Sequence, residues 1–470
     1  MAHRDKEDSK VHFNFEHLKI AIDSLLRYAS WGGVVWRSDC TWGSPRLFAI
    51  VALLWAWSDE KLVGDCFSTA RRIALAMFPQ TQNVANSFQA FLKLLIRWSG
   101  ALAAEMKSAL HKRMLEDFAD LMKIGMFNIM AVDGSRIGLP RTKSNENEFS
   151  VKRHKKKRNK KKRKPKKHRD KSAEKKANTI TMWITTLWHC GTGLPWDWRL
   201  GPSDSSERKH WLEMLAELTM PTLFVCDAGF VGYEYAKAVI AAGHHIIIRV
   251  GSNVTLIKQL GFATERGGTV YLWPNKSAKR NEAPLVLRLV VCHNGKHPVY
   301  LITSILSPRE FSDANVLAAY RQRWGIELFY RHLKQTFGMH KLKSRSSAAA
   351  YVEMTWSFLG LWCMAAYGLK QLHDKGISPN RLSFAKLIRA LQRMLRDYAQ
   401  PTEKKCRLCD LLLDAVIDNY QRGDKTSRDY PRKKNEKPPG PPKIRKATKQ
   451  EIQHAMQVKQ QNKPKIGLTA

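Results

Sequence analysis

The chain has 470 residues, 44% of them hydrophobic, which is enough for two or three domains with a substantial core. Its formal net charge of +39 favours a polyanionic partner such as DNA. The N-terminal residues are polar and the longest apolar runs, near 46–57 and 356–369, are too short to span a bilayer, so we expect neither a signal peptide nor a membrane span.

Residues 10–125 show a helical pattern of apolar residues, and we expect an N-terminal helical domain over residues 1–125. The apolar run at 46–57 is typical of a buried core helix. No recognition-helix motif is clear in this region, so a purely structural role remains an alternative to DNA binding.

Two aspartates follow short apolar runs that are typical of buried strands. Asp133 comes after residues 127–132, and Asp227 comes after residues 222–226 and before a helical pattern near 233–243. Open α/β sheets place their active sites at the carboxyl ends of strands, which favours a functional role for both residues. The alternative for each is a turn or helix-capping aspartate.

A basic insert at residues 150–178 follows the first strand. Residues 151–177 hold 17 Lys and Arg against 2 acids, a composition that buries no core, so we expect this insert to be disordered or extended. Its run at 152–169 could grip DNA without sequence preference. Strands are expected at about 179–187, 196–200 and 245–250, and a helix at 206–218.

Residues 251–300 alternate in polarity and separate Asp227 from Glu327 by 100 residues, which predicts a β-rich insertion. The following segment, 320–334, predicts a helix on which Tyr320, Arg323, Glu327 and Lys334 share one narrow face. A carboxylate that can hold a metal beside cations that hold phosphates is typical of phosphodiester chemistry. The alternative is an ion-pair network of Glu327 with Arg323 and Arg331.

Residues 346–421 predict two or three C-terminal helices, and residues 422–470 predict a disordered basic tail. Eight cysteines are scattered through the chain, and Cys406 and Cys409 form the one close pair. A single pair at this spacing is weak evidence for zinc, so we expect free thiols in the reducing cytoplasm.

The pattern Tyr-x2-Arg-x3-Glu-x6-Lys, matched at Tyr320, Arg323, Glu327 and Lys334, resembles the signature of the IS4-family insertion-sequence transposases. These are DDE enzymes, and the segments at 133–134 and 227–230 resemble the surroundings of their two catalytic aspartates. The resemblance implies an α/β fold with a ribonuclease-H-like catalytic core at 126–345, a β-rich insertion, and helical regions on both sides. It also implies that the N-terminal domain contacts the ends of the element.

The resemblance further implies a site with two Mg²⁺ ions, for which Mn²⁺ can substitute, held by Asp133, Asp227 and Glu327. Asp133 would bridge the two ions, and Tyr320, Arg323 and Lys334 would hold DNA phosphates. In this family a tryptophan of the insertion holds a flipped base, but the strand expected at 299–304 has none. Tyr300 is the nearest aromatic residue and Trp273 is a second candidate, although we interpret Trp273 as a core residue.

The implied function is DNA transposition. The protein, a homodimer in its DNA complex, would bind the terminal inverted repeats of its element, cleave the ends, and join each 3′-OH to target DNA. Alternatives are a domesticated or structure-selective nuclease with the same core, and a non-catalytic DNA-binding protein. Three acids with this spacing in so basic a chain argue against the last alternative.

Overall fold

The computed structural model describes residues 11–37, 40–81, 84–150, 180–293, 298–402, 407–417 and 440–462. Nearly all of the predicted basic insert at 150–178 and much of the predicted basic tail lie outside these ranges. Within them the chain forms one ten-stranded sheet whose strand order is β10-β6-β7-β8-β9-β5-β4-β1-β2-β3.

One half of this sheet is built from five strands. It comprises β1 (Asn128–Gly138), β2 (Thr181–His189), β3 (Leu194–Gly201), β4 (Thr222–Cys226) and β5 (His245–Val250). The first three strands are antiparallel neighbours, whereas β4 pairs in parallel with β1, and β5 in parallel with β4. The order β3-β2-β1-β4-β5 with these directions is the ribonuclease-H-like arrangement, which confirms the predicted fold class.

The other half of the sheet comes from the β-rich insertion. Its strands are β6 (Thr255–Lys258), β7 (Thr269–Leu272), β8 (Leu285–His293) and β9 (Pro298–Thr303), with α8 (Asn275–Lys279) between β7 and β8. Because β9 pairs with β5, the insertion continues the central sheet rather than forming a sheet of its own.

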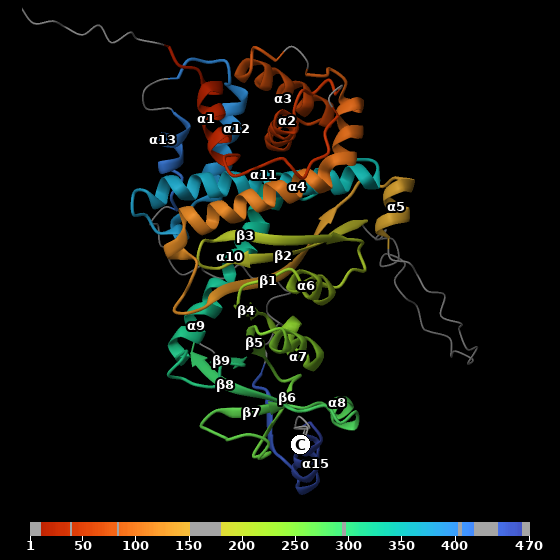
Figure 1. Cartoon of the computed structure of the whole chain (residues 1–470), viewed down its shortest axis with the longest axis vertical. Helices are drawn as coiled ribbons and strands as arrows, with labels where there is room; N and C mark the ends of the chain where they lie inside the picture. The colour runs from red at the N-terminus through yellow and green to blue at the C-terminus, as the bar shows by residue number, and fades with distance from the viewer. Residues whose placement is uncertain are drawn as a thin grey trace, which may run out of the picture.

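Helices from both ends of the chain pack into one layer. The N-terminal helices are α1 (Asn14–Leu25), α2 (Pro45–Trp57), α3 (Val63–Met77) and α4 (Phe88–Asp117), and the C-terminal ones are α11 (Ser347–His373), α12 (Phe384–Arg396) and α13 (Leu408–Leu413). Figure 1 shows α4 and α11 side by side, between the other helices and β1–β3. Every residue of α2 from Leu47 to Trp57 is buried, as its apolar run predicts.

The remaining helices flank the sheet. They are α5 (Lys143–Phe149), α6 (Glu207–Leu215), α7 (Tyr233–Ala241), α9 (Asp313–Gln322) and α10 (Trp324–Arg331), with a π-helical turn at His332–Thr336 and short 3₁₀ turns at Ala119–Leu121, Ala228–Phe230 and Pro379–Arg381. No helix in the described ranges is long and apolar enough to cross a membrane.

The predicted disordered tail is partly wrong. Residues 443–446 form β10 (Lys443–Lys446), which pairs in parallel with β6, and α15 (Lys449–Gln461) follows it. Ala455 and Val458 of α15 are buried in a small cluster with Ile257, Tyr271 and Trp273 of the insertion. These contacts with distant residues order the segment, and a local charge pattern does not reveal them.

Candidate active site

Asp133 and Asp227 come together because their strands are parallel neighbours. The paired residues of β1 and β4 run from Asn128 with Thr222 to Ala131 with Val225, and both aspartates lie two residues further on. Parallel strands are about 4.8 Å apart, so this register sets the two carboxylates side by side. The prediction that β1 ends before Asp133 is wrong, because β1 continues through it to Gly138, paired with β2.

Asp133 is a mostly buried carboxyl group among other acids. Burial is the main cause that raises its pKa to about 7, and the charges of Glu207 and Asp227 act in the same direction. The backbone N–H of Gly134 donates to Asp133 Oδ1 over 2.9 Å, and this hydrogen bond and the charge of Arg323 oppose the rise. Asp227 caps the turn at Ala228–Phe230, where its Oδ1 accepts from the N–H of Gly229 over 2.7 Å.

Glu327 lies on α10, where it is paired with Arg323. Arg323 Nη2 donates to Glu327 Oε1 over 2.7 Å, and their side chains are 12% and 32% exposed. Arg323 lies over the ring of Tyr320, and its Nε is buried without a hydrogen-bond partner. The structure therefore contains the ion pair between Glu327 and Arg323 that the sequence offered as the alternative. The predicted single helix is interrupted at Arg323, between α9 and α10.

Tyr330, which the sequence did not single out, connects α10 to the strand that carries Asp133. Its hydroxyl is 3.0 Å from the backbone oxygen of Asp133 and 2.9 Å from Thr186 Oγ1. Gly325 allows α10 to approach the sheet, because a Cβ there would lie 2.9 Å from Trp188 Nε1. These contacts fix the helix of Glu327 over β1 and β2. Nothing in the sequence around Tyr330 indicates that this tyrosine attaches the helix to β1.

The other residues predicted to contact DNA, Lys334 and Tyr300, lie in different elements of the structure. Lys334 is half-buried in the π-helical turn; burial lowers its pKa, and the charge of Asp133 acts in the opposite direction. Tyr300 lies on β9, opposite Val250 of β5 and Val291 of β8, and its stacking role stays a prediction. Trp273 is 4% exposed and donates through Nε1 to the backbone oxygen of Glu282, which confirms its interpretation as a core residue.

Two further residues near Asp133 and Asp227 were missed by sequence reasoning. Glu207 begins α6; burial raises its pKa, and the charge of Asp227 adds to this effect. Arg208 donates through Nε to the backbone oxygen of Gly229 over 2.9 Å and through Nη2 to that of Val231 over 3.1 Å. The start of a surface helix normally indicates only a cap, so neither residue stands out in the sequence.

The donor set suits a hard divalent cation, because Mg²⁺ prefers carboxylate oxygens. Asp133 and Asp227 each keep a carboxylate oxygen that accepts no hydrogen bond from the described residues. However, no three His, Cys, Asp or Glu side chains of the described chain lie close enough together to hold an ion. Asp133 and Asp227 lie at matching positions of adjacent strands, whereas Glu327 is engaged by Arg323, and the convergence of the three acids on one metal site stays a prediction.

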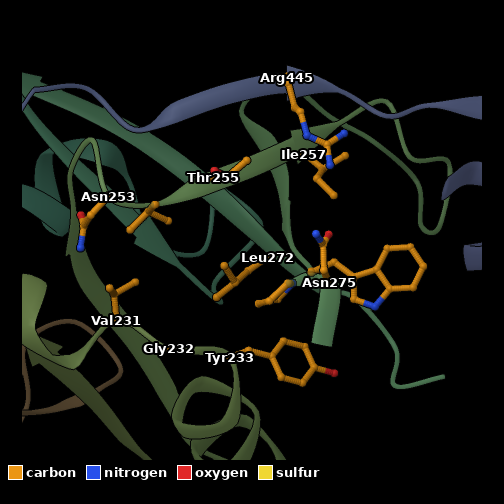
Figure 2. A pocket seen from close by; sticks show the side chains of 12 residues that line it. Val231, Gly232, Tyr233, Asn253, Thr255, Ile257, Leu272, Asn275 and Arg445 are labelled. Carbon is orange, nitrogen blue, oxygen red and sulfur yellow. The ribbon is translucent and has the colours of Figure 1, made fainter. Parts of the chain in front are cut away.

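A cavity of about 480 Å³ opens beside the segment that follows Asp227 (Figure 2). It is lined by Tyr233 from α7, by Thr255 and Ile257 from β6, by Asn275 from α8, and by Arg445 from β10. The insertion and the C-terminal segment thus form a hollow next to the Asp227 loop, and Asp133 and Glu327 do not line it.

A family model described as a transposase DDE domain matches residues 125–363, slightly more than half of the chain. The transposase InsG for insertion sequence element IS4 of Escherichia coli (strain K12) is 29% identical over 208 residues. That match covers 42% of this chain and 46% of InsG, so it spans less than half of the relative's length.

A solved structure of piggyBac transposase, in a synaptic complex with hairpin DNA, aligns with 90% of this chain and 88% of that chain. The identity is 13% and the TM-score is 0.38, a similarity too low to establish a shared fold by itself. The family match, in contrast, contains Asp133, Asp227 and Glu327 in a ribonuclease-H-like core, and the chain belongs to the IS4 family of DDE transposases.

Proposed function

We propose that this protein binds the terminal inverted repeats of its own element, cleaves the DNA ends by metal-assisted phosphodiester hydrolysis, and joins the 3′-OH ends to target DNA. The observation that carries the proposal is that Asp133 and Asp227 lie at matching positions just beyond the paired residues of β1 and β4, while Tyr330 of α10, the helix of Glu327, contacts the backbone of Asp133. The net charge of +39 supports binding to double-stranded DNA.

In this proposal Asp133, Asp227 and Glu327 would hold two Mg²⁺ ions, or Mn²⁺ in their place. When bound, such ions lower the pKa of a water nucleophile and stabilise the leaving oxygen. Asp133, whose carboxyl group is acted on by the charges of both Arg323 and Asp227, would be one of the ligands of these ions. The pairing of β1 with β4 and the contact of Tyr330 with the backbone of Asp133 would keep the two aspartates and α10 in place.

In this proposal Arg323 couples the binding of DNA to the assembly of the metal site. A DNA phosphate within its reach competes with Glu327 for the guanidinium, because both are anions that accept charge-assisted hydrogen bonds. Binding of the DNA end would then release Glu327 towards the two aspartates. Tyr320 and Lys334 would hold the same end, and Tyr300 would stack on a displaced base. A homodimer would bring two ends together.

The test is a stepwise assay on a labelled terminal-repeat duplex that resolves the nick, the hairpin, the double-strand break and the joined product. Asp133→Ala, Asp227→Ala and Glu327→Ala should each abolish cleavage with Mg²⁺ and leave DNA affinity nearly unchanged, since affinity depends on the basic surface. Glu310→Ala, which alters an exposed acid, is the control and should cleave normally. Substantial cleavage by any of the three site variants would remove that residue from the site.

Two other functions remain alternatives. A nuclease with the same core would cleave but would not join, and a DNA-binding protein without activity would do neither. The assay separates them, because only a transposase yields a joined product that depends on all three acids.

A further inference from the structure

Arg208 connects α6 to the loop that follows Asp227. It is the second residue of α6, which packs against α7 and against β1 and β2 (Figure 1). Its Nε donates to the backbone oxygen of Gly229 over 2.9 Å, and its Nη2 donates to that of Val231 over 3.1 Å. Hydrogen bonds from a charged donor are about twice as strong as neutral ones, so these contacts hold the loop against the helix.

The same guanidinium also packs on the helix that follows the loop. It lies over the ring of Tyr235, 5.0 Å from the ring centroid, and Tyr235 belongs to the first turn of α7. Gly232, the N-cap of α7, leaves room for both groups, because a Cβ there would be 3.2 Å from Tyr235 Cδ2 and 3.7 Å from Arg208 Nη1. Arg208 therefore contacts the chain on both sides of Gly232, in the loop and in α7.

Gly229 links Arg208 to the carboxylate of Asp227. The N–H of Gly229 donates to Asp227 Oδ1 over 2.7 Å, while its carbonyl oxygen accepts from Arg208. A Cβ built on Gly229 would be 2.9 Å from Asp227 Oδ1, so any side chain at this position would displace that oxygen. The direction of the Asp227 carboxylate thus depends on where the backbone of Gly229 is held.

We propose that Arg208 is a positioning residue for Asp227. By holding the carbonyl group of Gly229 it fixes the N–H of the same residue, and that N–H orients the Asp227 carboxylate. Arg208 touches no reacting group in this role. The inference rests on the proposed function, because it needs Asp227 to act in DNA cleavage, and it adds to the acids and the signature an arginine that belongs to neither.

The experiment compares Arg208→Ala with Lys209→Ala in the full-length protein, with a labelled terminal-repeat duplex and Mg²⁺. Lys209 is the next residue of α6 and is exposed, so its replacement removes an equal charge from the same turn. At saturating protein, Arg208→Ala should nick the first strand about 10- to 100-fold more slowly than Lys209→Ala, since a misplacement of about 1 Å can cost about 100-fold in rate. Both variants should bind the duplex with the same dissociation constant.

Hydrogen exchange separates positioning from a general loss of stability. Measured by mass spectrometry, exchange in the peptide 227–232 should be faster in Arg208→Ala, while β4 should exchange as in the wild type. An arginine that only stabilised the fold would protect the whole sheet to the same extent, and its loss would leave the folded protein nicking as fast as Lys209→Ala does.

Two further variants test the link through Gly229. Arg208→Lys keeps the charge, but one ammonium group cannot replace the planar fork that binds two oxygens and stacks on a ring, so nicking should remain slow. Gly229→Ala keeps Arg208 and displaces the Asp227 carboxylate, so it should also nick slowly, and it decides the question if Arg208→Ala does not fold.

The outcomes distinguish this inference from the proposed function. A nicking rate of Arg208→Ala equal to that of Lys209→Ala, full activity of Arg208→Lys or Gly229→Ala, or a loss confined to DNA affinity would overturn the positioning role. Normal cleavage by Asp227→Ala would instead contradict the proposed function itself.

Discussion

The protonation of Asp133 should make the metal-free protein less stable as the pH rises. Its pKa is about 7 in the folded chain, against an ordinary value of 3.8, and burial is the main cause. An unfolded chain loses this proton near pH 4, so between pH 4 and 7 the folded state binds more protons than the unfolded state, and the free energy of unfolding falls with pH. A shift of about three pH units corresponds to about 4 kcal/mol.

Asp133→Asn removes this titration, because the amide remains neutral. We expect the variant to match the wild type near pH 4 and to be more stable above pH 7, by up to about 4 kcal/mol. The measurement is urea unfolding with EDTA present, from pH 4 to 8, and the difference between the two curves reports the titration of Asp133 together with its effect on the neighbouring Glu207 and Asp227. A difference independent of pH would show that Asp133 is ionised throughout and that its burial costs nothing.

Four further predictions follow from the sites described. Arg323→Ala and Lys334→Ala should leave first-strand nicking measurable but strongly reduce joining; equal losses at both steps in the stepwise assay would indicate general substrate binding instead. Tyr300→Ala should reduce only hairpin formation in the same assay, if hairpins form, by removing a stacking partner for a base. Deletion of residues 152–169, which lie outside the described ranges, should lower the slope of log affinity against log salt by about 0.9 for each DNA phosphate that these residues neutralise, as measured by DNA titrations at several salt concentrations. Truncation after residue 439 removes β10 and α15, and it should expose Trp273 to solvent, seen as a red shift in tryptophan fluorescence, and cost about 2 kcal/mol because Val458 is no longer buried.

The strands that carry the two aspartates could be predicted because an apolar run is a local signal, whereas the choice of these aspartates as site residues came from the resemblance of the segments at 133–134 and 227–230 to those of the transposase family. Each aspartate follows a short apolar run, and the parallel pairing of those runs is a general property of α/β sheets. The signature on α10 was equally local, since a helix fixes which residues share a face. The pairing of Glu327 with Arg323 was one of two interpretations of that face, and only the structure determined which partner the arginine has in the absence of DNA.

Glu207 and Tyr330 could not be found in the same way. Glu207 lies beside Asp133 because Gly134, in another element, leaves room for it, and Tyr330 attaches α10 to β1 because its hydroxyl reaches the backbone of Asp133. Both contacts join residues that are far apart in the sequence. An acid in the first turn of a helix and a tyrosine in an amphipathic helix each have a commoner structural role, so their residue types alone indicate no function.

The C-terminal segment illustrates the same limit for a whole element. Its strand is almost entirely charged, and α15 buries only Ala455 and Val458, so neither element would be stable by itself. Their stability comes from the edge of β6, which supplies backbone hydrogen-bond partners, and from Ile257, Tyr271 and Trp273, which need an apolar cover. A basic composition therefore predicts disorder only where no unpaired strand edge and apolar cluster elsewhere in the fold can bind the segment, and in this chain the insertion provides both.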